Sequence, residues 1–154
     1  MKLLQLKAVL GLLAGTWIGL AQAEDVKKHY YTDIPGVEAR VLIKTNKAWN
    51  GSLLPEYGTG QPEITIVRYE FSPGASIPMH MHPVINAGVL LKGELWVMTK
   101  SGEKIILKAG DPLVELFKEW HYGVNPGKEP VELIVIYAGT VGTPLVVREN
   151  SAEK

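Results

Sequence analysis

The chain has 154 residues, of which 46% are hydrophobic and 21% are charged, and its formal net charge is zero. This composition excludes a disordered tail, because there are enough apolar side chains to bury a core. The balanced charge, without a basic cluster, argues against a nucleic-acid-binding protein, which needs grouped Lys and Arg to displace counterions. The chain has no cysteine, so neither a disulfide nor a thiolate ligand or nucleophile is available.

Residues 1–23 have the pattern of a secretory signal peptide. Lys2 and Lys7 are followed by the apolar stretch AVLGLLAGTWIGL and by the small-x-small triplet Ala21-Gln22-Ala23. The apolar stretch of about 13 residues is shorter than the roughly 20 that a helix needs to cross a bilayer. We therefore expect cleavage after Ala23 and a periplasmic or secreted protein with no further membrane contact. The alternative is an uncleaved anchor.

The rest of the sequence reads as a series of short β-strands. Runs rich in Val, Ile, Leu and aromatic residues end at Gly, Pro or Asn, and no extended helical period is present. Lys100-Ser101-Gly102-Glu103 predicts a tight hairpin, and the close spacing of the runs predicts an all-β, single-domain sandwich or small barrel. The predicted strands are Glu38–Lys44, Glu63–Phe71, Ile77–His82, Asn86–Leu91, Glu94–Thr99, Glu103–Leu107, Pro112–Phe117, Trp120–Val124, Val131–Tyr137 and Pro144–Val147.

We divide the chain after the signal into three parts. Residues 24–62 form an N-terminal arm that includes the first strand, residues 63–148 form the core of the barrel, and residues 149–154 form a tail. Within the arm, Asn46–Pro62 predicts a long loop. Such a loop is either functional or interfacial, or it is a plain surface excursion.

Two histidines one residue apart carry the chemistry of the sequence. In a strand, residues i and i+2 point to the same face, so His80 and His82 project together, about 7 Å apart along the backbone. Both can reach one metal ion at about 2.1 Å, and His121, on a later strand, is the candidate for a third ligand. Three neutral imidazoles leave coordination positions open, as a catalytic metal requires.

The spacing of the neighbouring residues resembles the cupin superfamily. The first motif of that family is Gly, five residues, His-x-His, three or four residues, Glu, six residues, Gly. The second is Gly, five residues, Pro-x-Gly, two residues, His, three residues, Asn. The residues at these positions are Gly74, His80, His82, Asn86 and Gly93, then Gly110, Leu116, Lys118, His121 and Asn125. The resemblance implies a small jelly-roll β-barrel with a metal in its mouth, and a homodimer.

The sequence departs from the family pattern at two places. Asn86 stands where the family has its glutamate ligand, and Leu116-Phe117-Lys118 replaces Pro-x-Gly. Asn86 is therefore predicted as a neutral fourth ligand, or as a residue that orients a ligand, and it cannot serve as a general base. Without that carboxylate the site is expected to keep the full +2 charge of its metal and to attract anions. We expect Glu115 and Glu119 to be solvated; the alternative is that one of them points inward and supplies the missing carboxylate.

The motifs support three functional hypotheses. The first is a metal-dependent, dioxygenase-like oxidoreductase that acts on a small organic or anionic substrate. The second is a non-catalytic module that binds or senses a small molecule or metal, and the third is a metal-independent isomerase or epimerase. The sequence does not choose among iron, manganese, zinc, copper and nickel, and it assigns no catalytic residue. We expect some of the methionines and aromatic residues near the motifs to form part of the cavity wall, and for each of them the alternative is plain core packing. They are Met79, Met81, Trp96, Met98, Phe117, Trp120 and Tyr122.

Overall fold

The computed structural model describes residues 34–149. The predicted signal peptide, residues 1–23, and all but the first residue of the predicted tail lie outside this range. The chain divides into two units, Met1–Val41 and Leu42–Lys154. Within residues 34–149, no helix has the length and hydropathy that a bilayer crossing requires.

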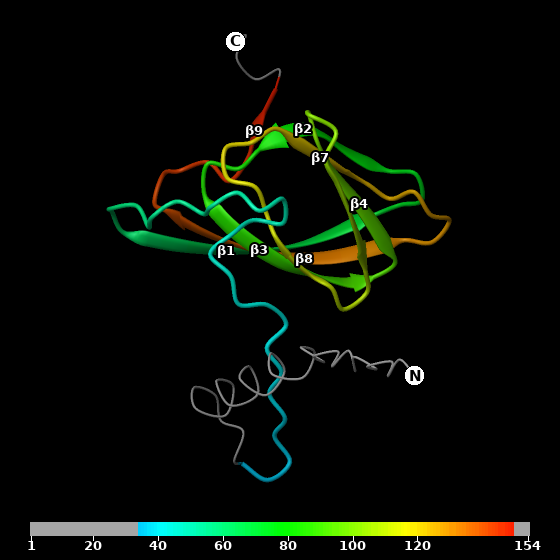
Figure 1. Ribbon diagram of the computed structural model, residues 1–154, viewed down its shortest axis with the longest axis horizontal. Coiled ribbons are helices and arrows are strands. Elements are labelled where there is room, and N and C mark those ends of the chain that lie inside the picture. Colours follow the sequence, from blue (N-terminus) through cyan, green and yellow to red (C-terminus); the bar gives the residue numbers. More distant parts are fainter. Residues whose placement is uncertain (1–33, 150–154) are drawn as a thin grey trace, which may run out of the picture. The chain divides into compact units, whose positions relative to one another are not determined.

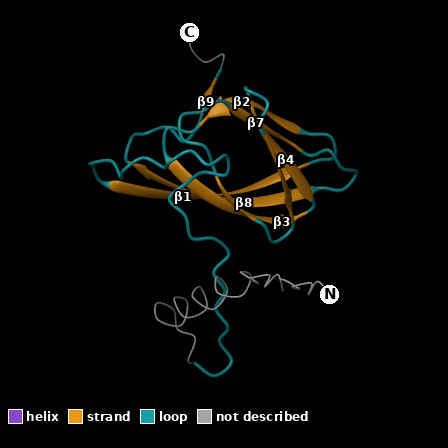
Figure 2. Ribbon diagram, in the orientation of Figure 1, coloured by secondary structure: helices purple, strands orange, loops and turns teal. Residues whose placement is uncertain are grey.

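The second unit is built from β-strands, and the described residues contain no helix (Figures 1 and 2). Along the strands, β-branched and aromatic side chains alternate between buried and exposed positions, as expected for strands that cover a core on one face. The strands are β1 (Pro62–Phe71), β2 (Ser76–Met81), β3 (Ile85–Lys92), β4 (Glu94–Thr99), β5 (Lys104–Lys108), β6 (Pro112–Val114), β7 (His121–Val124), β8 (Val131–Thr140) and β9 (Val147–Arg148).

The strands form two antiparallel sheets. One has the order β1-β8-β3-β6 and the other β5-β4-β7-β2-β9, and Figure 1 shows β1, β3 and β8 together, apart from β2, β4, β7 and β9. The predicted hairpin joins β4 and β5, where Gly102 adopts the left-handed conformation with φ of 96°. The prediction of an all-β jelly-roll barrel is confirmed.

The prediction of a strand at Glu38–Lys44 is wrong. This segment is almost entirely exposed, with Leu42 and Ile43 about half exposed, and it pairs with no strand. Between residues 34 and 61 the only β-pairing is an isolated bridge from Lys47 to Leu53. A β-like sequence without a neighbouring edge cannot bury its apolar face, so its intrinsic preference is not enough to form a strand.

The predicted loop within the arm is confirmed, and it protects an edge of the sheet. The Trp49 backbone N–H donates to the carbonyl of Val114 at 3.0 Å. Val114 is the last residue of β6, and β6 is the outermost strand of the four-stranded sheet. The loop therefore occupies part of an edge that would otherwise be open to pairing with another chain.

The core lies between the two sheets. Alternate residues of β3, β4 and β8 point inward and are buried, and the opposite residues are more exposed. Burying side chains of this size stabilises the fold by about 1.5–3 kcal/mol each. The cluster consists of Phe71, Val84, Leu90, Leu95, Val97, Leu107, Leu113, Val131, Leu133, Val135 and Tyr137.

Candidate metal centre

At one level of the barrel the inward-facing side chains of the five-stranded sheet become polar. His121 lies opposite Thr99 of β4 and opposite His80 of β2, and His80 also lies opposite Arg148 of β9. Residues directly opposite each other in an antiparallel pair share a face of the sheet. A polar row, Thr99–His121–His80–Arg148, thus crosses four strands.

A second polar row lies on the four-stranded sheet. Asn86 of β3 is opposite Tyr137 of β8. On its other side the β3–β6 register, in which Ala87 pairs with Val114, places Glu115 opposite Asn86, and the Glu115 N–H donates to the Asn86 carbonyl at 3.1 Å. Tyr137, Asn86 and Glu115 are all buried.

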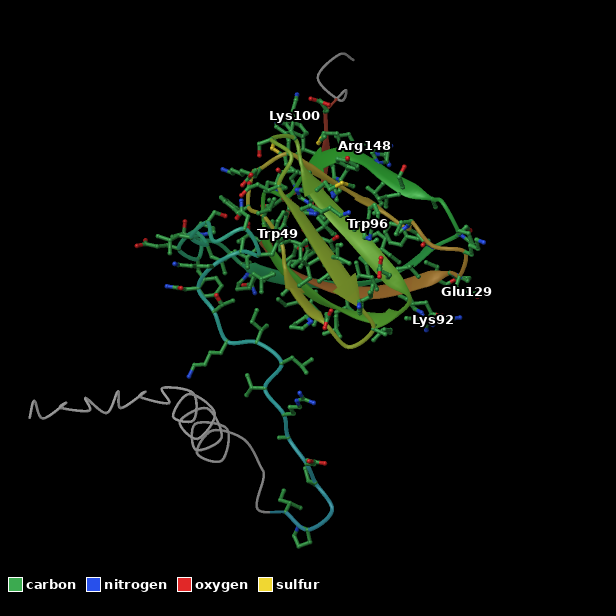
Figure 3. The ribbon with its side chains drawn as sticks, turned by 45° about the vertical axis from the view of Figure 1, so that its right-hand side comes forward. Trp49, Lys92, Trp96, Lys100, Glu129 and Arg148 are labelled. Atoms are coloured by element: carbon green, nitrogen blue, oxygen red, sulfur yellow. The ribbon has the colours of Figure 1, made fainter. Side chains whose placement is uncertain are left out.

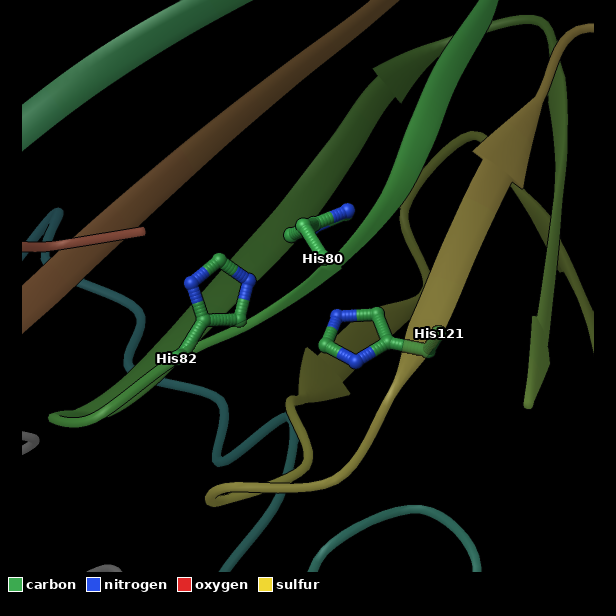
Figure 4. Close-up of side chains that lie close together, drawn as sticks. All are labelled: His80, His82 and His121. Carbon is green, nitrogen blue, oxygen red and sulfur yellow. The ribbon is translucent and has the colours of Figure 1, made fainter. Parts of the chain in front are cut away.

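The structure brings the three predicted histidines together. His80 is on β2, His82 follows directly after that strand, and His121 begins β7; their rings face one another (Figure 4). One ring nitrogen from each lies within 4.8 Å of the others, and all three side chains are buried. The prediction from strand alternation, that His80 and His82 project together, is confirmed.

Backbone carbonyls hold all three rings in place. The Nδ1 atoms of His80, His82 and His121 lie 2.8 Å from the carbonyl oxygens of Pro78, Leu145 and Glu119, respectively. A carbonyl can only accept a hydrogen bond, so each Nδ1 carries a proton, and in the neutral ring each Nε2 keeps a lone pair. Hydrogen bonds of this kind orient histidine ligands in metal sites.

The environment of His80 and His82 favours the neutral imidazole. Burial lowers the pKa of His80 to about 4 and also holds the pKa of His82 below its ordinary value, because the charged form loses its hydration. Neutral imidazole is the form that binds a metal ion. At neutral pH these two rings are therefore already in the ligand form.

A carboxylate also points into the site. Glu115 is 8% exposed, and its Oε2 lies 3.3 Å from Nε2 of His121. Burial opposes the charge on both groups, but their mutual attraction outweighs it: the pKa of His121 is raised and the pKa of Glu115 is lowered. The expectation that Glu115 is solvated, and that the site lacks a carboxylate, is therefore wrong.

The local fold explains why Glu115 is buried. Residues 113–116 are all buried, so the alternation of a strand stops after β6. Glu119, by contrast, is half-buried and accepts a hydrogen bond from Nδ2 of Asn50, in the loop of the arm, at 3.1 Å. Of the two acidic residues flagged by the sequence, only Glu115 faces the histidines.

Several buried polar atoms at this level make no hydrogen bond. They are Oδ1 and Nδ2 of Asn86, Oε2 of Glu115 and Nε2 of His121. A buried polar atom without a partner costs about 1–3 kcal/mol, and native proteins contain few of them. Such a group of atoms, beside three oriented imidazoles, fits a divalent transition metal, and the three histidines could hold one.

A cavity of about 460 Å³ opens beside the histidines, a volume that suits a small organic molecule. Its walls are mainly apolar and come from both sheets. Glu115, Tyr137 and Arg148 also line it, and Asn86 does not. Figure 3 shows Arg148 on β9, close to the end of the described chain. The apolar and aromatic wall residues are Tyr69, Phe71, Ile77, Pro78, Leu95, Val97, Leu133, Val135, Tyr137 and Val146.

The methionines and aromatic residues predicted for this wall do not line the cavity. Met81 and Tyr122 are sequence neighbours of the inward histidines, and Trp96 and Met98 alternate with inward Leu95, Val97 and Thr99. Neighbouring residues in a strand point to opposite faces, so these side chains turn away from the interior.

Two paired tyrosine hydroxyls line the cavity near the histidines. The hydroxyl groups of Tyr69 and Tyr137 lie 2.8 Å apart, and the Tyr137 ring packs 5.5 Å from that of His82. Burial raises the pKa of Tyr137, and the hydrogen bond with Tyr69 raises it further. The Tyr137 hydroxyl therefore stays protonated and can donate to a bound molecule.

The second departure from the family pattern has a conformational cost. Lys118 occupies the place of the motif glycine and adopts φ of 54°, the only described non-glycine residue with a positive φ. The Lys118 N–H donates to the carbonyl of His82 at 2.9 Å. The left-handed conformation thus belongs to a turn that connects the two motifs directly.

Asn125, the last residue of the second motif, has a structural role. Its Nδ2 donates to the carbonyls of Phe71, Ser72 and Glu129 at 3.2, 3.1 and 2.8 Å. Its backbone carbonyl accepts from the N–H of Gly74, the first residue of the other motif, at 3.1 Å. Asn125 therefore joins the two motifs at the end of the barrel away from the histidines.

The fold and the histidine cluster together define a jelly-roll β-barrel with an interior site able to hold a metal. The family model described as a cupin domain matches residues 67–137. The resemblance to the cupin superfamily that the spacing of the motifs predicted is confirmed by this match.

The curated relatives that the chain matches include plant oxalate oxidases. Oxalate oxidase GF-2.8 of Triticum aestivum is 29% identical over 116 residues, covering 64% of this chain and 52% of the relative. Oxalate oxidase 1 of Hordeum vulgare is 30% identical over 116 residues, covering 64% of this chain and 58% of the relative. The chain thus spans little more than half the length of these relatives.

Two of the solved structures with a similar chain trace are the following. One is an oxalate oxidase in complex with the substrate analogue glycolate, with 26% identity, a TM-score of 0.48, and coverage of 55% of this chain and 45% of the other. The other is an uncharacterized conserved protein with a double-stranded β-helix domain from Klebsiella pneumoniae, with 25% identity, a TM-score of 0.48, and coverage of 60% and 90%.

Proposed function

We propose that this protein binds one divalent transition metal through His80, His82 and His121 and acts as an oxidoreductase on a small organic anion. The observation that carries the proposal is the orientation of the three rings: each Nδ1 is bonded to a carbonyl, so in the neutral form each ring has its Nε2 lone pair for a ligand bond. Asn86, predicted as a fourth ligand or as a residue that orients one, lies in the facing row, and that role stays a prediction.

The cavity supports a small, partly apolar anion as substrate. Among the described residues that line it, Arg148 is the one with a fixed positive charge, and Tyr69 and Tyr137 present hydroxyl groups. An arginine can bind a carboxylate through two parallel hydrogen bonds, while the apolar walls exclude water from the bound molecule. A redox-active metal, when bound, supplies electron transfer between the substrate and dioxygen.

The likeness to oxalate oxidases suggests the first substrates to test. Protein purified and loaded with Mn²⁺, Fe²⁺ or Cu²⁺ should consume dioxygen with oxalate or with another small carboxylate, and the rate should fall to background in the His121→Ala variant. Oxygen uptake at an electrode measures this directly. Phenols and thiols extend the panel. Equal oxygen uptake by the wild type and the variant would contradict an oxidative role for the site.

Protein isolated from its native source, without added metal, separates the other two hypotheses. Stoichiometric zinc in protein from its native source, with no turnover on any substrate of the panel, indicates a non-catalytic binding module. A folded protein that takes up no metal indicates a metal-independent isomerase or epimerase. Elemental analysis and the oxygen electrode together therefore assign one of the three.

We further propose that the protein is exported after cleavage behind Ala23 and that it forms a homodimer. The signal pattern of residues 1–23 supports export. Ile64 and Ile66 on β1 are 60% and 66% exposed, and β1 is an edge strand; an apolar edge of this kind favours pairing with a second copy. N-terminal sequencing of the processed protein tests the first statement. Light scattering of the Ile66→Lys variant tests the second, because a dimer held by this edge should become a monomer.

A further inference from the structure

We propose that Glu115 supplies the carboxylate ligand of the metal, so that the oxygen donor which the family pattern places at position 86 has moved across the sheet to the neighbouring strand. The inference rests on the proposed function, because it assumes that the three histidines hold a metal. It replaces Asn86 as the predicted fourth ligand.

The register of the sheet explains how this exchange preserves the site. Asn86 and Glu115 are opposite each other on β3 and in the segment that continues β6, and they are joined by the hydrogen bond from the Glu115 N–H to the Asn86 carbonyl. Side chains at opposite positions leave the same face at the same level, about 5 Å apart. A carboxylate at position 86 and a carboxylate at position 115 would therefore both belong to the same polar row.

The contact between Glu115 and His121 has the geometry of two ligands that share an ion. Oε2 of Glu115 and Nε2 of His121 lie 3.3 Å apart, and both atoms lack a hydrogen bond. Two donors each about 2.1 Å from one metal ion are separated by about 3.0 Å at a right angle and by about 3.4 Å at the tetrahedral angle. The observed separation lies between these values.

The position of Asn86 agrees with this assignment. Glu115 lines the cavity with the three histidines, whereas Asn86 does not, although both side chains are buried. A carboxylate ligand lowers the charge of the occupied site from +2 to +1. It is also a stronger donor to a divalent ion than a neutral amide oxygen.

Metal affinity measured without turnover tests the proposal. Chelator-stripped protein is titrated with Co²⁺, whose visible absorption reports binding and coordination, in competition with a chelator of known affinity. Glu115→Gln replaces the carboxylate with a neutral amide, which is a weaker donor. It should weaken Co²⁺ binding by about 100-fold, the upper end of the loss that follows removal of an outer partner of a metal ligand. Glu119→Gln removes the same charge from the same loop and should stay within about threefold of the wild type.

A compensating variant makes the test specific. Asn86→Glu in the Glu115→Gln background returns a carboxylate to the polar row, and it should regain at least about tenfold of the lost affinity. Co²⁺ binding by Glu115→Gln as tight as that of Glu119→Gln would overturn the role of Glu115 and leave the three-histidine site intact. A wild-type protein that binds no Co²⁺ would overturn the proposed function as well.

A direct structural measurement covers the case in which Glu115→Gln does not fold. In a crystal structure of the wild-type protein with Co²⁺, an Oε atom of Glu115 should lie about 2.0–2.2 Å from the ion. A Glu115 carboxylate more than about 3 Å from an ion bound to the histidines would overturn the proposal.

Discussion

The two polar rows that face each other in the barrel differ in how their atoms are satisfied. In the row on the five-stranded sheet, both histidines, like neighbouring His82, have one nitrogen fixed by a backbone carbonyl and one available. In the row on the four-stranded sheet, Asn86 and Glu115 present polar atoms that make no hydrogen bond. Hydrogen bonds to the backbone thus fix the imidazole rings, whereas the unpaired side-chain atoms of the facing row have no such bond to the backbone. This difference agrees with the proposed exchange, in which the histidines keep the family spacing while the carboxylate moves to the neighbouring strand.

Removing an imidazole from the histidine row should have the largest effect on metal binding. His121→Ala should weaken Co²⁺ binding by about 1,000-fold or more, because a direct ligand contributes more than the 10–100-fold of an outer partner. Competition titration measures the loss. His29→Ala, which removes the remaining histidine of the chain, is the matched control and should bind like the wild type; a similar loss in that variant would assign the effect to something other than the site.

Substitution of two buried asparagines tests whether Asn86, in the row on the four-stranded sheet, lacks hydrogen-bond partners in the metal-free protein. Asn125 is 1% exposed and makes four hydrogen bonds through its side chain, whereas Asn86 is 2% exposed and makes none. Asn125→Ala should lower the free energy of unfolding by about 3 kcal/mol, and Asn86→Ala should change it by about 1 kcal/mol or less. Urea unfolding of both variants measures this difference. Equal destabilisation would mean that Asn86 has partners in solution.

Alanine substitutions at two inward-facing glycines, one in each sheet, show how tightly each sheet is packed. A Cβ at Gly88 of β3 would lie 2.4 Å from the carbonyl oxygen of Ile134, while one at Gly123 of β7 would have its nearest neighbours at 3.9 Å. Gly88→Ala should therefore lower the free energy of unfolding by about 1–3 kcal/mol, as overpacking does. Gly123→Ala should change it far less. Thermal unfolding distinguishes the two, and similar melting temperatures would show that β3 can shift away from β8.

The smallest expected effect concerns the turn between the motifs. Lys118 adopts a positive φ, which costs a non-glycine residue roughly 1–2 kcal/mol. Lys118→Gly should relieve this cost and raise the free energy of unfolding by up to about 1 kcal/mol, after the loss of chain entropy that glycine brings. Urea unfolding checks the sign. A Lys118→Gly protein less stable than the wild type would indicate that the lysine side chain contributes contacts that outweigh the backbone strain.

The histidine cluster could be predicted because it depends on local rules. Alternation along one strand places His80 beside His82, and the motif spacing brings His121 to the neighbouring strand. The fold class followed for the same reason: short apolar runs between turn residues occur only in a few architectures. The strand expected at Glu38–Lys44 fails because a strand also needs a partner, and the sequence of the segment does not say whether one is within reach.

The rest of the site depends on contacts between distant segments. The cavity wall comes from β1, β2, β4, β7 and β8 together, and nothing in the sequence identifies residues such as Phe71 and Leu133 as part of it. Alternation could have corrected one expectation, because Met81 and Tyr122 are next to inward histidines and must point the other way. It could not have located Glu115, since the regular pattern ends with β6 and residues 113–116 are buried in succession.

The carbonyl oxygens that hold the rings of His80, His82 and His121 have a consequence for how an ion reaches the protein. Because the chain itself sets the tautomer and the direction of each ring, loading does not have to wait for the protein to fold around the ion. A site prepared in this way takes whichever suitable ion it meets, with copper and zinc favoured over iron and manganese by intrinsic affinity. For the proposed metal site, the element that is bound is then decided by the compartment in which the chain first meets a suitable ion.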